Sequence, residues 1–265
     1  MSLASAASPT LPAPFSLAGR CALVTGASAG LGAHFAHVLA GAGAEVWLAA
    51  RRTDRLHALK RELRSGGAVV SSVALDVTDA AGVAAAFDAV AVAGAVADIV
   101  VNNAGVGLGT PALDTSEQDW DNVTDTNLKG SWLVAVEAAR RLVAAGRPGS
   151  IVNIASILGE RVGLSVAPYA ASKAGIVQLT KALALEWARY RIRVNALCPG
   201  YIATDINREF LASDAGDKMR KRIPQRRFGE AGDLDGPLLL LASDAGRYMT
   251  GAVLAVDGGH LVSGL

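Results

Sequence analysis

The chain has 265 residues, 51% of them hydrophobic, and its 25 basic and 24 acidic residues leave a formal net charge of +1. This length and composition suit one large α/β domain with a sizeable core, and the balanced charge provides no general field that would attract nucleic acid. Cys21 and Cys198 are the only cysteines, and each stands beside a strand-like run, so we expect two buried thiols and neither a disulfide framework nor a metal site.

Residues 1–15 are rich in alanine, serine and proline and lack both a basic start and a continuous apolar run. This composition predicts a flexible tail rather than a signal peptide, followed by one domain over 16–265. No apolar run approaches the roughly 20 residues that span a bilayer. We therefore expect a soluble, cytoplasmic protein without a membrane partner.

The first unit of the chain reads as a strand, a glycine-rich turn and a helix. An apolar run over 20–25 ends at Gly26, and a helical pattern follows over 31–42. Between them Gly26, Gly30 and Gly32 give the spacing G-x-x-x-G-x-G. Small residues there let the backbone approach a pyrophosphate, and the helix N-terminus supplies N–H donors. This unit predicts nucleotide binding.

Strands and helices alternate along the rest of the chain. Further strands are expected at 45–50, 69–75, 98–101, 150–155, 193–197 and 253–256, and further helices at 54–65, 80–94, 117–145, 169–190 and 234–242. A polar and charged segment over 203–228 is expected to form a mobile lid with a short helix. The alternation predicts an α/β fold: a single doubly wound parallel sheet, Rossmann-like, with helices on both faces.

Ligands of such sheets bind beyond the carboxyl ends of the strands. The residues that follow the first six predicted strands are therefore candidates for one binding site: Gly26, Arg51, Asp76, Asn103, Ser156 and Pro199.

Tyr169 and Lys173 are four residues apart at the start of a predicted helix, so their side chains share one face. A phenol with an ordinary pKa near 10 is a poor acid or base at neutral pH, and a nearby ammonium lowers that pKa. The pair predicts a group for proton transfer.

Several motifs agree in order and spacing with one family. They are TGASAGLG at 25–32, NNAG at 102–105, Asn127, Ser156, YAASK at 169–173 and PG at 199–200. On these motifs the chain resembles the short-chain dehydrogenase/reductase family over roughly residues 17–260, in particular its 3-oxoacyl reductase-like members that prefer NADP.

The resemblance implies an oxidoreductase that transfers hydride between a nicotinamide cofactor and a carbonyl/secondary-alcohol pair. Tyr169 would be the general acid or base, and Lys173 would lower its pKa and hold the nicotinamide ribose. Ser156 would orient the substrate oxygen, and Asn127 would hold a water that links Lys173 to solvent.

The resemblance also implies which residues hold the cofactor. Gly26, Ser28, Gly30 and Leu31 would line the pyrophosphate, with Gly32 packing the helix close. Asp76 and Val77 would lie at the adenine and Asn103 near its ribose. The remaining candidates are Ala104, Gly105, Tyr169, Lys173, Pro199, Gly200, Ile202 and Thr204, with Ile202 and Thr204 on the nicotinamide side.

The end of the second strand predicts the choice of cofactor. Ala50 stands where members that prefer NAD commonly carry an acid, and Arg51 follows it. A guanidinium can hold a ribose 2′-phosphate, and Arg52 either assists or faces solvent. Ala29 stands where many NADP-dependent members carry a second basic residue, which counts against a strong preference and leaves it mainly to Arg51. A charge-assisted hydrogen bond is worth roughly ten- to a hundredfold in affinity, and we expect NADP to be preferred over NAD by that factor, with NAD as the weaker alternative.

The motifs leave the substrate open among 3-oxoacyl thioesters, small ketones, steroids and sugars. Six basic residues in the lid would suit an anionic substrate, although a solvated charged face is the favoured interpretation: Lys218, Arg220, Lys221, Arg222, Arg226 and Arg227. A non-catalytic nucleotide-binding protein is the alternative class, opposed by the presence of all four catalytic residues. Similar proteins are commonly homotetramers, which the resemblance implies here.

Overall fold

A parallel sheet of seven strands forms the centre of the computed structural model, which describes residues 12–204 and 208–263. The strands lie in the order β3-β2-β1-β4-β5-β6-β7. They are β1 Cys21–Thr25, β2 Glu45–Ala50, β3 Val70–Ala74, β4 Ile99–Asn102, β5 Gly149–Ile154, β6 Ile192–Pro199 and β7 Val253–Val256. The predicted doubly wound sheet is thus confirmed, and the order reverses between β1 and β4, where such folds bind their ligands.

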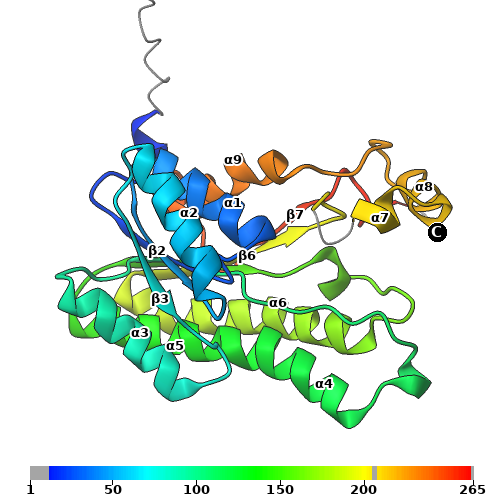
Figure 1. Ribbon diagram of the computed structural model, residues 1–265, viewed down its shortest axis with the longest axis horizontal. Helices are drawn as coiled ribbons and strands as arrows, with labels where there is room; N and C mark the ends of the chain where they lie inside the picture. Colours follow the sequence, from blue (N-terminus) through cyan, green and yellow to red (C-terminus); the bar gives the residue numbers. More distant parts are fainter. Residues whose placement is uncertain (1–11, 205–207, 264–265) are drawn as a thin grey trace, which may run out of the picture.

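Helices cover both faces of the sheet (Figure 1). One layer contains α1, α2 and α9, and the other contains α3, α4, α5 and α6. The helices are α1 Gly30–Gly41, α2 Thr53–Ser65, α3 Ala80–Val92, α4 Glu117–Thr124, α5 Gly130–Ala144, α6 Ala167–Trp187, α7 Arg208–Leu211, α8 Asp214–Arg220 and α9 Asp235–Ala242.

Each face of the sheet has its own apolar core. Phe35 and Leu39 of α1 pack with the strands on one face, and Phe87 of α3 and Leu142 of α5 pack on the other. A strand covered on both sides has no solvent face, which is why all five residues of β1 are buried and its sequence reads as an unbroken apolar run.

The long helix expected over 117–145 is interrupted by a π-helical segment, η3 Asp125–Lys129, between α4 and α5. Such a bulge adds one residue to a turn and is frequent at functional sites. Asn127 lies inside it and is fully buried. The apolar periodicity of the sequence continues through the bulge, so it does not reveal this change in helix type.

Residues 1–11 of the predicted tail lie outside the described residues. The last part of the tail is ordered: Ala13–Phe15 forms a 3₁₀ turn, and Phe15 packs against the core near Leu17. The lid segment 203–228 contains α7 and α8, with residues 205–207 outside the described part.

Within residues 12–204 and 208–263, no helix is both long and apolar enough to cross a bilayer, and no three acidic, histidine or cysteine side chains gather into a metal-binding group.

Candidate active site

The glycine-rich turn between β1 and α1 forms a cradle that side chains would fill. Gly26 and Gly30 have positive φ angles of +67° and +55°. A Cβ on Gly26 would lie 2.9 Å from the Cα of Ala104, and one on Gly32 only 2.3 Å from the carbonyl oxygen of Gly26. Gly26 is therefore required for both backbone conformation and close packing, Gly30 for conformation and Gly32 for packing.

The N-terminus of α1 faces this cradle without a side-chain cap. Its N-cap is Ala29, which offers no acceptor, and the first turn contains no acidic residue. The first N–H groups of a helix need an acceptor, and they favour an anion. The turn thus fits a pyrophosphate, as the sequence predicts.

Thr25 connects the glycine-rich turn to the NNAG segment. Its hydroxyl accepts hydrogen bonds from the backbone N–H groups of Asn103 and Ala104, both at 3.0 Å. The side-chain amide of Asn103 donates to the Thr25 carbonyl at 3.1 Å. These bonds fix the ends of β1 and β4 together. The role of Thr25 was absent from the sequence prediction, although it is the first letter of the TGASAGLG motif.

Two arginines follow β2 at the edge of the cradle. Arg52 donates through Nε and Nη2 to the Ser28 hydroxyl, at 3.1 and 2.9 Å. Arg51 is largely exposed, and its Nη1 lies 3.7 Å from a carboxylate oxygen of Asp76. The structure therefore places Arg52 on the glycine-rich turn, and its contact with the cofactor stays a prediction.

Asp76 and Val77 follow β3, and only Asp76 presents its side chain at the rim. The backbone N–H of Thr78 donates to the Asp76 carboxylate, and this bond, with a smaller contribution from Arg51, lowers the pKa of Asp76. Asp76 is therefore an anion at neutral pH. The Val77 side chain is buried, and a Cβ on Gly130 would lie 2.6 Å from it, so any contact of Val77 with a ligand must come from its backbone.

Tyr169, Lys173 and Ser156 lie together beyond β5. Tyr169 and Lys173 stand one turn apart on α6, with Lys173 Nζ 5.5 Å from the centre of the phenol ring. Ser156 is buried between β5 and η4 Ile157–Gly159, where its hydroxyl accepts from the N–H of Leu158 at 3.1 Å. Lys173 is also buried, and its ammonium donates to the carbonyl oxygen of Ile154 at 2.8 Å.

Burial dominates the electrostatics of this group. It lowers the pKa of Lys173 to about 8. It also raises the pKa of Tyr169, and a side-chain hydrogen bond with Ser156 opposes that rise. The expected lowering of the tyrosine pKa by Lys173 is not what this structure has, because desolvation of the phenol is the largest effect and the ammonium bonds to Ile154. The lowering of the pKa during turnover stays a prediction.

The Asn127 side chain, in the π-helical turn, forms hydrogen bonds with three groups. Its Oδ1 accepts from the N–H of Val106 at 2.8 Å, and its Nδ2 donates to the Val106 carbonyl and to the Ser172 hydroxyl. Ser172 in turn donates to the carbonyl of Tyr169. A Cβ on Gly105 would lie 3.1 Å from Asn127 Oδ1 and 3.7 Å from Lys173 Nζ. Asn127 therefore links the segment after β4 to the first turn of α6.

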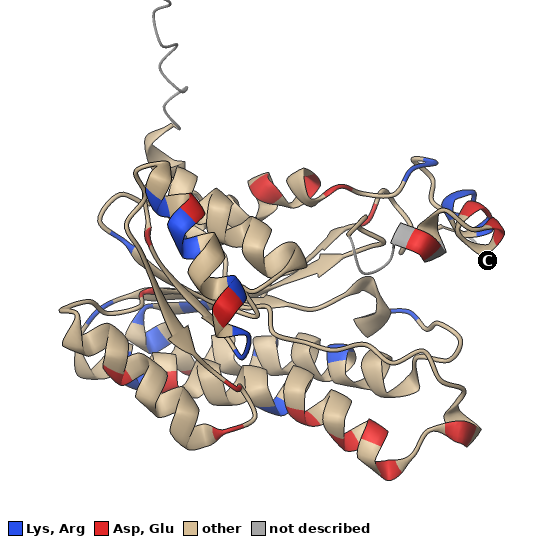
Figure 2. Cartoon of the chain, in the orientation of Figure 1, with Lys and Arg blue, Asp and Glu red and all other residues tan. Residues whose placement is uncertain are grey.

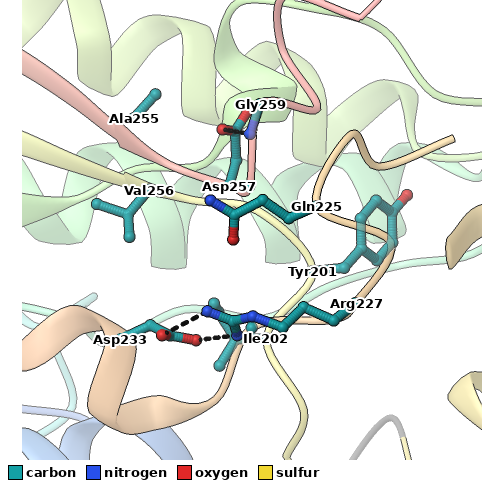
Figure 3. A pocket seen from close by; sticks show the side chains of 11 residues that line it. Tyr201, Ile202, Gln225, Arg227, Asp233, Ala255, Val256, Asp257 and Gly259 are labelled. Carbon is teal, nitrogen blue, oxygen red and sulfur yellow. Dashed lines mark hydrogen bonds and ion pairs between the residues drawn. The ribbon is translucent and has the colours of Figure 1, made fainter.

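The segment after β6 forms the other wall. Pro199 is the last residue of β6, and a Cβ on Gly200 would lie 2.7 Å from that of Asp257. Ile202 forms an isolated bridge with Gly229. The adjoining hollow has a volume of about 350 Å³. Figure 3 shows Tyr201, Gln225 and the ion pair of Arg227 with Asp233 in its lining. Thr204 is the last described residue before the gap at 205–207.

Three residues near the catalytic group escaped the sequence prediction: Arg161, Tyr201 and His260. A guanidinium nitrogen of Arg161 donates to the carbonyl oxygen of His260. The rings of Tyr201 and His260 lie 5.6 Å apart between centroids. These residues come from three segments far apart in the sequence and belong to no motif, so only the fold brings them together.

The basic residues of the lid are partly neutralised. Arg220 pairs with Asp217 at 2.7 Å, and Arg227 forms two bonds with Asp233, at 2.6 and 2.8 Å. Figure 2 shows basic and acidic residues interspersed on α8. The interpretation of the lid as a solvated charged face thus accounts for these two arginines, and no ligand is needed to explain them.

Comparison with known proteins gives a consistent set of relatives. A family model described as enoyl-(acyl carrier protein) reductase matches residues 26–260. The chain is 38% identical to gluconate 5-dehydrogenase of Gluconobacter oxydans over 253 residues, which cover 95% of this chain and 98% of the relative. It is 40% identical to a galactitol 2-dehydrogenase (L-tagatose-forming) of Cereibacter sphaeroides, over 94% of this chain and 97% of the relative.

A solved structure shows the same architecture. The crystal structure of a gluconate 5-dehydrogenase from Burkholderia cenocepacia in complex with NADP and tartrate superimposes with a TM-score of 0.91. The two sequences are 37% identical, and the match covers 95% of this chain and 98% of that one.

Proposed function

The chain belongs to the short-chain dehydrogenase/reductase family, and from that premise we propose that it is an NADP-dependent dehydrogenase of polyhydroxylated substrates. Members of this family interconvert an alcohol and a carbonyl group. The observation that carries the proposal is the grouping of Ser156, Tyr169 and Lys173 beside an uncapped, glycine-lined helix N-terminus. Its relatives act on gluconate and galactitol, as their names state.

The cofactor supplies or accepts the hydride, and the protein supplies position and a proton. In the direction of reduction, negative charge grows on the carbonyl oxygen of the substrate. The hydroxyl groups of Ser156 and Tyr169 donate hydrogen bonds to that oxygen, which stabilises the transition state more than the ground state. Tyr169 then passes its proton to the oxygen, and in oxidation it receives one.

The raised pKa of Tyr169 keeps the phenol protonated at neutral pH, which is the form that reduction needs. Lys173 is fixed by Ile154 against the same face of α6 and lies where it can bond a ribose hydroxyl. Asn127 holds Ser172 and the segment after β4, so it positions the first turn of α6, on which Tyr169 stands. These roles are our proposals for the four residues.

The cofactor contacts follow the same geometry. The pyrophosphate would lie on the N–H groups at the start of α1, near Gly26, Gly30 and Leu31. The 2′-phosphate of NADP would lie between Arg51 and Arg52, and the Ser28 hydroxyl bonded to Arg52 offers it a further donor. The gluconate 5-dehydrogenase structure described above is a complex with NADP.

A reductase of 3-oxoacyl thioesters is less well supported. The lid arginines that would meet a carrier phosphate include two that are already paired with Asp217 and Asp233. A non-catalytic protein on this fold is opposed by the complete catalytic set. We further propose a cytoplasmic location, where the reduced and oxidised cofactors are both available, and a homotetramer.

The direct test is a spectrophotometric screen at 340 nm with NADP and NAD in parallel. We expect turnover of a sugar acid or a polyol that requires NADP, and little with 3-oxoacyl-coenzyme A. Turnover of the thioester alone would favour the reductase, and binding of NADP without turnover of any alcohol, ketone or thioester would contradict an enzymatic role.

A further inference from the structure

Among the described residues, no carboxylate forms an ion pair with Arg161. Arg161 lies five residues after Ser156, on the segment that joins β5 to α6 and therefore Ser156 to Tyr169. One guanidinium N–H donates to the carbonyl oxygen of His260, which ties this segment to the chain after β7. A guanidinium has five N–H donors, so this anchor leaves others free to bind a ligand.

The neighbours of Arg161 lead back to the catalytic phenol. Tyr201 packs its ring against His260, and it interacts electrostatically with Arg161 on one side and with Tyr169 on the other. The pKa of His260 is lowered by burial and by Arg161, so its ring is neutral at pH 7. The positive charge of this cluster thus belongs to Arg161, with exposed Arg222 adding to the field at His260.

The acidic side chains close to this cluster do not neutralise Arg161. Glu160, its neighbour in sequence, is exposed and forms no ion pair with it. The Asp257 carboxylate accepts the backbone N–H groups of Gly259 and Leu261. Within residues 12–204 and 208–263, Arg161 therefore has no anionic partner, whereas lid residues Arg220 and Arg227 each have one.

We propose that the guanidinium of Arg161 binds a carboxylate group of the substrate and makes this enzyme select polyhydroxy acids over neutral polyols. The inference rests on the proposed function and narrows its substrate class. The reacting alcohol lies at Ser156 and Tyr169, and the carboxylate lies toward Arg161, Tyr201 and His260. The relatives alone do not decide this point, because one is named for an acid and another for a neutral polyol.

Arginine suits this task because its planar donors match the two oxygens of a carboxylate. A charge-assisted hydrogen bond of this kind corresponds to roughly ten- to a hundredfold in binding. The loss should be seen mainly in KM, because the carboxylate is remote from the reacting carbon and contributes equally to the ground state and the transition state.

The test compares gluconate with the neutral polyols sorbitol and galactitol, using the full chain and NADP. Arg161→Gln should lower kcat/KM for gluconate by roughly ten- to a hundredfold through KM, and Arg161→Lys should lose less. Both variants should keep the KM for NADP and the activity toward the polyol. Arg247→Gln, which removes an exposed arginine that has no ion pair among the described residues, is the matched control and should change nothing.

A binding measurement separates recognition from folding. Tartrate should compete with gluconate in the unaltered enzyme, and its affinity for the NADP complex, measured by calorimetry, should fall at least tenfold in Arg161→Gln. If Arg161→Gln loses kcat/KM equally for gluconate and for the polyol, or if its affinity for tartrate is unchanged, the proposed role of Arg161 is overturned. Turnover of polyols without any turnover of sugar acids would overturn this inference alone, and absence of turnover with both classes would overturn the proposed function with it.

Discussion

Tyr169 and Lys173 are held in a site that favours the neutral form of each. Burial raises the pKa of the phenol and lowers that of the ammonium to about 8. A protonated phenol can donate a proton to a nascent alkoxide, so the cofactor-free site is prepared for reduction. Oxidation needs the phenolate, and its rate should therefore rise with pH.

Tyr169→Phe tests the proton transfer directly. The ring still packs, and only the hydroxyl is lost, so folding and NADP binding should be preserved. We expect turnover to fall by at least roughly 10²–10⁴-fold, as is typical for a lost acid or base. Steady-state rates in both directions and a fluorescence titration with NADPH measure the two effects. Near-normal turnover would show that another group carries the proton.

Lys173→Met should lower activity and raise the stability of the cofactor-free protein. The folded pKa of about 8 lies below the ordinary 10.5, so the buried charge opposes folding at neutral pH. This difference is worth on the order of 3 kcal/mol. The native protein releases its proton first, so the penalty disappears as pH rises from about 8 to 10.5.

Chemical unfolding would show this effect as a larger free energy of unfolding for Lys173→Met than for the unaltered protein at pH 7. The difference should be smaller at pH 10.5. If Lys173 lowers the pKa of Tyr169 during turnover, as we predict, the same variant should move the alkaline limb of NADP-dependent oxidation to higher pH. An unmoved limb would mean that Lys173 does not tune Tyr169.

The sequence predicts those site residues whose type recurs at a fixed spacing within a helix or at a strand end. Tyr169 and Lys173 share a helix face, and Ser156 ends a strand, so their meeting follows from the fold. Arg161, Tyr201 and His260 meet through a backbone carbonyl and a ring contact between segments that have no periodic relation. Thr25 could have been identified, since a hydroxyl at the end of β1 lies beside the backbone N–H groups that follow β4, its neighbour in the sheet.

The connection between β2 and α2 is the element that we propose selects the cofactor. Ala50 is the last residue of β2, and Arg51 and Arg52 follow before α2 begins. Arg52 is bonded to Ser28, and Arg51 is weakly paired with Asp76, so each already lies at the rim of the glycine-rich turn. Their placement needs little change when a phosphate binds.

Replacing this connection should reverse the cofactor preference. The unaltered protein should prefer NADP by roughly ten- to a hundredfold in kcat/KM. Arg51→Ala together with Ala50→Asp adds a carboxylate for the 2′-hydroxyl and removes one cation, and adding Arg52→Ala should complete the change. Arg55→Gln, an exposed residue one turn into α2, is the control. Equal efficiency with both cofactors in the unaltered protein would refute the assignment of these arginines.

The glycine-rich turn shows how far an element can be predicted. Its position between a strand and a helix was evident, and so was the need for small residues. The π-helical segment around Asn127 was not, because a bulge shifts one turn without disturbing the apolar pattern on either side. The apolar periodicity of a sequence predicts a helix over its whole length but does not reveal where one extra residue is inserted into a turn.

On the scale of the whole molecule, the sheet follows from alternation alone. Each apolar run fills one buried strand, and each helix must return the chain to the same edge, so a parallel order with helices on both faces is the expected result. The sequence does not predict the strand order or the division into two cores, since several strand orders are compatible with the same alternation of strands and helices.

Exposed apolar groups lie on the helix layer that contains α4, α5 and α6, and we propose that this layer joins copies of the chain. Between η3, α5 and α6 lies an apolar groove lined by Leu128, Trp132 and Leu179. Trp132 and Trp120 are each 44% exposed, and Leu185 is 84% exposed. Patches of this kind mark contact sites, and a two-fold axis would place the same groove on both partners.

If this face joins copies of the chain in the proposed homotetramer, Trp132→Ser should weaken the assembly. The substitution removes a large apolar side chain that lines the groove, and truncation of an aromatic hot spot costs about 2 kcal/mol or more at an interface. Light scattering across a dilution series should show a smaller species in the variant at concentrations where the unaltered chain is tetrameric. Tyr248→Ser, at a fully exposed aromatic far from the groove in sequence, is the matched control. A monomer in the unaltered protein, or an unchanged mass in Trp132→Ser, would show that this face does not join copies of the chain.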